Sequence, residues 1–194
     1  MWDYERKLMY PVKIKNPNPA LAKMVIAQYG GPDGELGASL RYLSQRFTMP
    51  DSVTKGLLTD IGTEELAHLE MVGALVNQLT RGTNAKCVKE SGFADYFINH
   101  STGVYPANSN GSPFNAMAIA VSGDPITDLN EDLAAEQKAR ATYDNILRLS
   151  DDPDVNDVIK FLRAREIAHY QRFGEALRRV EEKLTDNNKF YMNK

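Results

Sequence analysis

The chain has 194 residues and a net charge of −3, a length that fits one domain with a sizeable core. The small acidic charge gives no indication of nucleic acid or an anionic membrane as a partner, and no apolar run reaches the roughly 18–20 residues of a membrane span. The single cysteine, Cys87, excludes an intramolecular disulfide and a cysteine-rich metal site. The start has neither the basic region nor the apolar stretch of a secretory signal, so we expect synthesis in the cytoplasm.

Residues 1–19 are rich in both aromatic residues and prolines. Prolines at 11, 17 and 19 oppose a helix, whereas Trp2, Tyr4 and Tyr10 are too many aromatics for a disordered tail. The pattern predicts an extended segment that lies on the domain's own surface or takes part in a subunit contact.

Residues 20–82 carry two helical patterns with apolar residues at alternating steps of three and four. The first pattern reads Leu21, Met24, Gln28, Gly31, Glu35, Ala38 and Tyr42. Gly30-Gly31-Pro32 interrupts it, and the proline predicts a kink. The second pattern reads Leu58, Ile61, Glu65, His68, Val72, Leu75 and Leu79. The link between the two is short, so we expect an antiparallel helical hairpin.

A second hairpin is expected over residues 126–184. Its patterns read Ile126, Leu129, Leu133, Glu136, Arg140, Tyr143 and Leu147, then Val155, Val158, Leu162, Glu166, His169, Phe173, Ala176, Val180 and Leu184. Asp-Pro pairs at 124–125 and 152–153 are typical of helix starts. Residues 83–125 form a long crossover between helices two and three, and residues 185–194 form a tail. The prediction is an all-α, ferritin-like four-helix bundle in a single domain over residues 1–194.

Acids and imidazoles interrupt all four apolar patterns near their middle. Glu65 and His68 are three residues apart, hence neighbours on one helix face, and Glu166 and His169 repeat this spacing. Glu35 and Glu136 add one carboxylate from each remaining helix. One Glu from each of two helices and Glu-x-x-His from each of the other two is the ligand inventory of di-iron and di-manganese bundles.

The alternative is that these residues are ordinary polar groups of the core or of a helix surface. The apolar neighbours on the same faces argue against a surface position, and burying four carboxylates without compensation is costly. Two divalent cations balance four carboxylates, so the sequence predicts a dinuclear metal site. Oxygen-rich ligation with two imidazoles suits iron or manganese, and the residues alone do not choose between them.

Two further residues lie near these six in the sequence. Tyr42 lies two turns after Glu35 on the same face, so it is either a core tyrosine or a group that hydrogen-bonds or carries protons near the metals. Glu64 falls outside the apolar patterns and is expected to be a solvated helix charge.

With these residues placed, the chain resembles the manganese catalase family, and most closely its short spore-coat (CotJC-type) branch. The most specific stretches are residues 28–36, 59–68, 134–141 and 165–169, and the resemblance runs over nearly the whole chain. It implies that Glu35 and His68 bind one manganese ion, that Glu136 and His169 bind the other, and that Glu65 bridges them.

The role of Glu166 stays open between metal ligand and nearby acid or base. Some manganese catalases have an arginine just before the residue matching Glu136, where this chain has Ala135. The resemblance also matches Tyr42 to a tyrosine close to the metals, so Glu166 and Tyr42 are the candidate catalytic residues.

The resemblance implies a catalase with two manganese ions per subunit that converts hydrogen peroxide to water and dioxygen. It further implies a homo-oligomer, a hexamer by family analogy, deposited in the spore coat with other coat proteins as possible partners. The alternatives are a structural coat protein with a stabilising metal site, or a di-iron ferroxidase or peroxidase.

Overall fold

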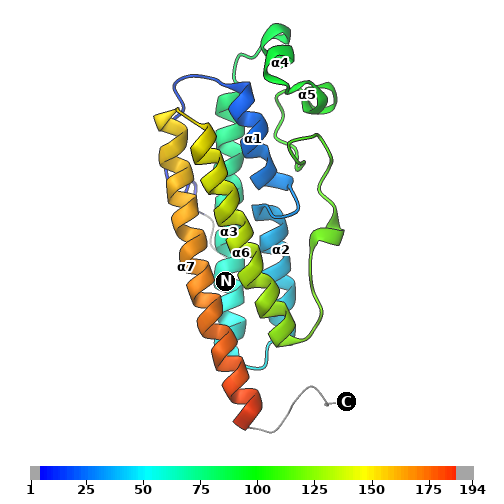
Figure 1. The fold of residues 1–194 in the computed structure, drawn as a ribbon, viewed down its shortest axis with the longest axis vertical. Helices are drawn as coiled ribbons and strands as arrows, with labels where there is room; N and C mark the ends of the chain where they lie inside the picture. Colours follow the sequence, from blue (N-terminus) through cyan, green and yellow to red (C-terminus); the bar gives the residue numbers. More distant parts are fainter. Residues whose placement is uncertain (1–4, 187–194) are drawn as a thin grey trace.

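Long helices that run alongside one another make up the computed structural model, which describes residues 5–186 (Figure 1). The elements of the bundle are α1 (Pro19–Gly30), α2 (Glu35–Gln45), α3 (Ser52–Leu79), α6 (Pro125–Leu149) and α7 (Pro153–Asp186). Helices α1 and α2 together occupy one of the four positions, and both pack on α3, while α6 packs on α7. No strand occurs among the described residues, and two packed helical hairpins are joined by a long crossover between α3 and α6, which confirms the all-α, ferritin-like fold class.

The Asp-Pro pairs predicted as helix starts lie at the first turns of α6 and α7, and Asp51 caps α3 in the same way. Asp51 accepts the backbone N–H of Thr54, and Asp124 accepts that of Thr127. Asp152 accepts the N–H of Asp154 at 2.9 Å. These carboxylates satisfy N–H groups that have no partner inside the helix, so each fixes the first turn of α3, α6 or α7.

The prediction of a kinked, continuous helix near Pro32 is wrong, because the helix breaks completely there. Helix α1 ends at Gly30, Gly31 adopts an extended conformation, and α2 starts at Glu35 after the cap residue Gly34. A Cβ atom at Gly31 or Gly34 would lie 2.3 or 2.7 Å from a backbone oxygen at the end of α1, so the tight link between α1 and α2 requires glycine. As a result Glu35 lies in the first turn of α2.

The crossover between α3 and α6 contains two short helices, α4 (Ala85–Ser91) and α5 (Ala94–His100), and a 3₁₀ turn at Ala116–Ala118. It runs along the outside of α1 and α2 (Figure 1). Arg41 donates to the carbonyl of Ala118, and Gln45 donates to that of Ala120, both at 2.8 Å. The crossover is therefore fixed to the helix that carries Glu35. None of the helices over residues 5–186 is long and apolar enough to cross a membrane.

The described part of the N-terminal segment packs on the bundle itself. Tyr10 stacks on Phe161 of α7 with ring centroids 4.5 Å apart. Gln78 of α3 accepts the N–H of Ile14 and donates to the carbonyl of Val12. These contacts agree with a segment that lies on the domain's own surface. Trp2 and Tyr4 lie outside the described residues, as does the end of the predicted tail, residues 187–194.

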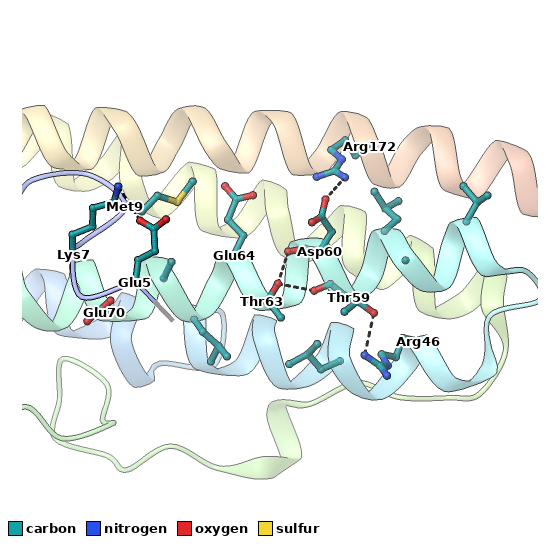
Figure 2. A pocket seen from close by; sticks show the side chains of 16 residues that line it. Glu5, Lys7, Met9, Arg46, Thr59, Asp60, Thr63, Glu64, Glu70 and Arg172 are labelled. Carbon is teal, nitrogen blue, oxygen red and sulfur yellow. Dashed lines mark hydrogen bonds and ion pairs between the residues drawn. The ribbon is translucent and has the colours of Figure 1, made fainter. Parts of the chain in front are cut away.

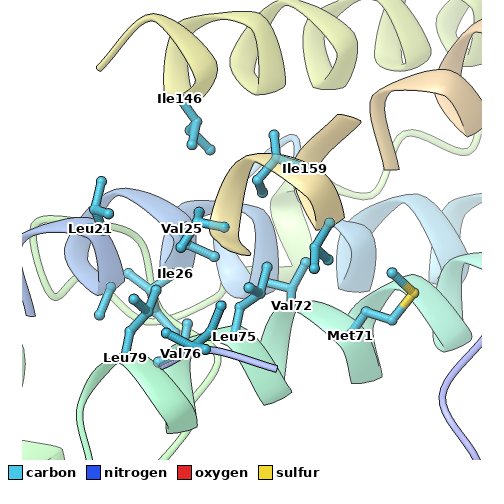
Figure 3. Packing of buried hydrophobic residues seen from close by; sticks show 14 of the residues in the cluster. Leu21, Val25, Ile26, Met71, Val72, Leu75, Val76, Leu79, Ile146 and Ile159 are labelled. Carbon is cyan, nitrogen blue, oxygen red and sulfur yellow. The ribbon is translucent and has the colours of Figure 1, made fainter. Parts of the chain in front are cut away.

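Two apolar clusters fill the bundle, one toward each end. The larger contains Val25 and Ile26 of α1, Val72 and Leu75 of α3, and Ile159 of α7 (Figure 3). The smaller is formed by Tyr42, Met49, Leu58, Ile61, Leu129, Phe173, Ala176 and Val180. Along α3 and α7 the predicted polar residues fall between the two clusters, so apolar layers separate them from both ends of the bundle.

Candidate metal centre

Six acidic and imidazole side chains meet in the middle of the bundle, and each is at most 2% exposed. They are the six that the sequence predicts: Glu35 of α2, Glu65 and His68 of α3, Glu136 of α6, and Glu166 and His169 of α7. Burial of this many ionisable groups requires either shared protons or compensating cations.

The six side chains form two overlapping groups. In the first, Glu35, Glu65, His68 and Glu166 offer ligand atoms that all lie within 4.8 Å of one another. In the second, Glu65, Glu136, Glu166 and His169 do the same. Each group has one imidazole and one carboxylate of its own, while Glu65 and Glu166 belong to both. This is the arrangement that a pair of neighbouring ions needs.

Both imidazoles turn the same ring nitrogen toward the carboxylates. Nδ1 of His68 is 2.7 Å from Glu65 and 3.7 Å from both Glu35 and Glu166. Nδ1 of His169 is 2.8 Å from the other oxygen of Glu65 and 3.6 Å from Glu136. The two carboxylate oxygens of Glu65 therefore face different imidazoles, so this residue lies at the centre of the cluster.

The donor atoms fit a divalent metal. One oxygen each of Glu65, Glu136 and Glu166, and Nδ1 of His169, are buried and have no hydrogen bond of acceptable geometry. Buried polar atoms are almost always paired, so four such atoms in one cluster without a hydrogen bond indicate a site that can bind a cation. Carboxylate oxygens and neutral imidazole nitrogens are ligands that manganese and iron accept.

Electrostatics lead to the same conclusion. Burial, then the charge of Glu65, raises the pKa of Glu35 to about 8. Burial and the neighbouring carboxylates likewise raise the pKa of Glu166 well above its ordinary value. Burial alone would lower the pKa of His169, but the charge of Glu65 and the contacts with Glu136 and Glu64 together outweigh burial and raise that pKa to about 11. The metal-free site thus holds protons that two cations would displace.

A pair of tyrosines holds the outer carboxylates in a crossed pattern. Tyr42 of α2 donates to Glu136 of α6 at 2.5 Å, while Tyr143 of α6 donates to Glu35 of α2. Tyr42 was predicted from the sequence, and Tyr143 was not. The signal was present, because Tyr42 follows Glu35 at the same spacing as Tyr143 follows Glu136.

The prediction that Glu64 is a solvated helix charge is wrong. Its side chain is only 15% exposed, and its oxygens lie 3.5 Å from Nε2 of His68 and 3.2 Å from Nε2 of His169. Burial raises its pKa, but contacts with the two imidazoles and Arg165 outweigh this and hold the pKa well below the ordinary value. Arg140, by contrast, bonds to Gln137 and Asp144 rather than to the cluster.

Comparison with known proteins identifies the family of this site. Residues 1–189 match the family described as manganese containing catalase. The chain belongs to that family. It is 55% identical to Protein CotJC of Bacillus subtilis over 182 residues, which cover 94% of this chain and 96% of that protein. It is 35% identical to a probable manganese catalase of Clostridium acetobutylicum, over 98% of this chain and 89% of the other.

The fold comparison agrees with the sequence comparison. The crystal structure of KatB, a manganese catalase from Anabaena, superimposes with a TM-score of 0.87 at 34% identity. The match covers 100% of this chain and 86% of KatB. Membership in the manganese catalase family therefore extends from the short motifs to the arrangement of the whole bundle.

Proposed function

We propose that this protein is a dinuclear manganese catalase that converts two hydrogen peroxide molecules into two water molecules and one dioxygen. The observation that carries the proposal is the pair of overlapping ligand groups that share Glu65 and Glu166, in a chain of the manganese catalase family. We assign one ion to Glu35 and His68, the other to Glu136 and His169, and the bridging position to Glu65.

Bound manganese would supply the two-electron redox capacity that disproportionation requires, as well as Lewis acidity. The residues of the chain do the rest. Glu166 is buried and borders both ligand groups, so its carboxylate is placed to accept a proton from peroxide and to return it when water forms. Tyr42 and Tyr143 hold Glu136 and Glu35 in place through their hydroxyl groups.

The surroundings protect this chemistry. Apolar clusters on both sides of the site keep bulk water away from the carboxylates, which strengthens every electrostatic interaction among them. The proposal also includes assembly into a homo-oligomer and deposition in the spore coat, both of which follow from the resemblance of the sequence.

The test is oxygen evolution from peroxide by manganese-loaded protein. Wild-type protein should evolve oxygen, while Glu65→Ala and His169→Ala should lose nearly all of the rate because each removes a proposed ligand. Glu131→Ala is the control, since Glu131 is a partly exposed acid of α6 that pairs with Lys138 outside the cluster. Variants that keep full activity with the proposed ligands removed would contradict the assignment.

The second candidate is a structural coat protein whose metal site holds the bundle together. Its support is the crowding of buried acids, which makes the metal-free fold costly, and the 55% identity with Protein CotJC. Negligible turnover by fully loaded protein, together with a large loss of assembly on chelation, would favour this candidate. Metal analysis of protein purified without added metal separates manganese from the iron alternative.

A further inference from the structure

We propose that Glu64 is a shared positioning residue that fixes both candidate metal-binding histidines through their outer ring nitrogens. The inference rests on the proposed metal site and adds to it a residue that does not itself face the ions. Oε1 of Glu64 lies 3.5 Å from Nε2 of His68, and Oε2 lies 3.2 Å from Nε2 of His169. A single carboxylate thus reaches both rings, one with each oxygen.

Both histidines need such an acceptor. Their Nδ1 atoms face the carboxylate cluster, so a histidine that binds metal there carries its proton on Nε2. The two rings are fully buried, and neither Nε2 atom makes a hydrogen bond of acceptable geometry within residues 5–186, so the Glu64 oxygens at 3.5 and 3.2 Å are the acceptors within reach. Metal-bound histidines nearly always donate their second N–H to a carboxylate, carbonyl or water, which sets the tautomer and the ring orientation.

Arg165 fixes Glu64 in turn. Its Nε lies 2.5 Å from Oε1 and its terminal nitrogen lies 3.2 Å from Oε2, a two-point contact that sets the plane of the carboxylate. Figure 2 shows Glu64 pointing from α3 toward α7.

The position of this pair in the two helices explains why one acid is sufficient. Glu64 immediately precedes the Glu-x-x-His of α3, and Arg165 immediately precedes that of α7. The two halves of the bundle carry matching Glu-x-x-His pairs, and the residue before each pair differs. Helix α3 supplies the acid that contacts both histidines, and helix α7 supplies the arginine that forms an ion pair with this acid.

A matched pair lies one turn away. Glu64 lines an open groove of about 1300 Å³ on the outer side of α3, together with Asp60 and Arg172. Asp60 and Arg172 are 2.7 Å apart, and Asp60 is 66% exposed. Asp60 and Arg172 are again an acid of α3 and an arginine of α7. Removing the Asp60 charge therefore shows the effect of losing an ion pair between these two helices without a change beside the histidines.

The experiment measures the affinity of metal-free full-length protein for manganese(II) alone, by electron paramagnetic resonance of the free ion. Glu64→Gln keeps the shape and removes the charge, and it should bind manganese about 10–100-fold more weakly. Asp60→Asn should stay within threefold of wild type. Arg165→Gln should lose clearly less than Glu64→Gln, because the acid remains beside the rings.

The ordering of the variants decides the inference. Glu64→Asp keeps the charge and should bind manganese more tightly than Glu64→Gln. A Glu64→Gln affinity within threefold of wild type, or an equal loss in Arg165→Gln, would show that Glu64 serves only as an interhelix ion pair. Oxygen evolution is recorded in parallel: tight manganese binding without oxygen contradicts the proposed function but leaves this inference standing on the affinities.

Discussion

Replacing Tyr42 by phenylalanine tests whether the tyrosines control the metal-binding carboxylates. The hydroxyl of Tyr42 is buried and donates to Glu136 at 2.5 Å, and the second oxygen of Glu136 has no hydrogen bond. Phenylalanine keeps the ring contact with Phe173, whose centroid is 4.8 Å away. The change therefore removes one hydrogen bond, leaves the packing in place, and leaves the Glu136 side chain without a hydrogen bond.

The magnitude follows from that hydrogen bond. A hydrogen bond to a charged group contributes about 1.5–3 kcal/mol to stability. For a chain of this size each kcal/mol corresponds to roughly 2–4 °C, so the Tm of the metal-free protein should fall by about 3–12 °C. Manganese affinity and the rate of oxygen evolution should each fall about 10–100-fold, because Glu136 loses the group that orients it.

The matched control is Tyr96→Phe. The hydroxyl of Tyr96 donates to the carbonyl of Gly103 at 2.6 Å in the crossover, away from the metal site. This variant should be less stable than wild type but keep wild-type manganese affinity and oxygen evolution. The reasoning is refuted if Tyr42→Phe and Tyr96→Phe both lose stability and neither changes metal affinity.

The remaining predictions concern the other tyrosine, pH and the crossover. Tyr143→Phe removes the donor to Glu35 and should weaken manganese binding about tenfold, measured by the same titration. The free energy of unfolding of the metal-free protein should fall as pH rises from 4.5 to about 8, because folded Glu35 keeps a proton that the unfolded chain has lost. Glu35→Gln should flatten this pH dependence, measured by thermal unfolding at a series of pH values. An unchanged slope in Glu35→Gln would show that a group other than Glu35 causes the pH dependence. Gly30→Ala places a methyl group 2.3 Å from the backbone of Ala107 and should cost about 1–3 kcal/mol in denaturant unfolding.

The fold was predictable because the sequence features that determine each helix lie within that helix or directly beside it. Apolar spacing defines each helix, and residues such as Asp51 and Asp124 mark their starts through hydrogen bonds to the next turn. The break after Gly30 was not predictable, because Gly30-Gly31-Pro32 is compatible with a kink or a break. Which of the two forms depends on the close approach of the crossover to Gly30, a contact between residues far apart in the sequence.

The candidate site was predictable to the extent that its residues lie on the apolar faces. Glu35, Glu65 and His68 lie on those faces, and the structure brings them together as the sequence predicts. Glu64 was missed because it lies beside the face of α3, where burial depends on how closely α7 approaches. Tyr143 was missed because a tyrosine in an apolar pattern looks like core, and only its partner on α2 distinguishes it.

The most direct test of the central claim is a metal-resolved oxygen-evolution assay on the wild-type protein. Metal-free protein is loaded separately with manganese and with iron, the metal content per chain is measured, and dioxygen release from peroxide is recorded. We predict two manganese ions per chain and oxygen evolution that rises in proportion to manganese content. Protein that holds two manganese ions per chain and releases no oxygen would contradict the account.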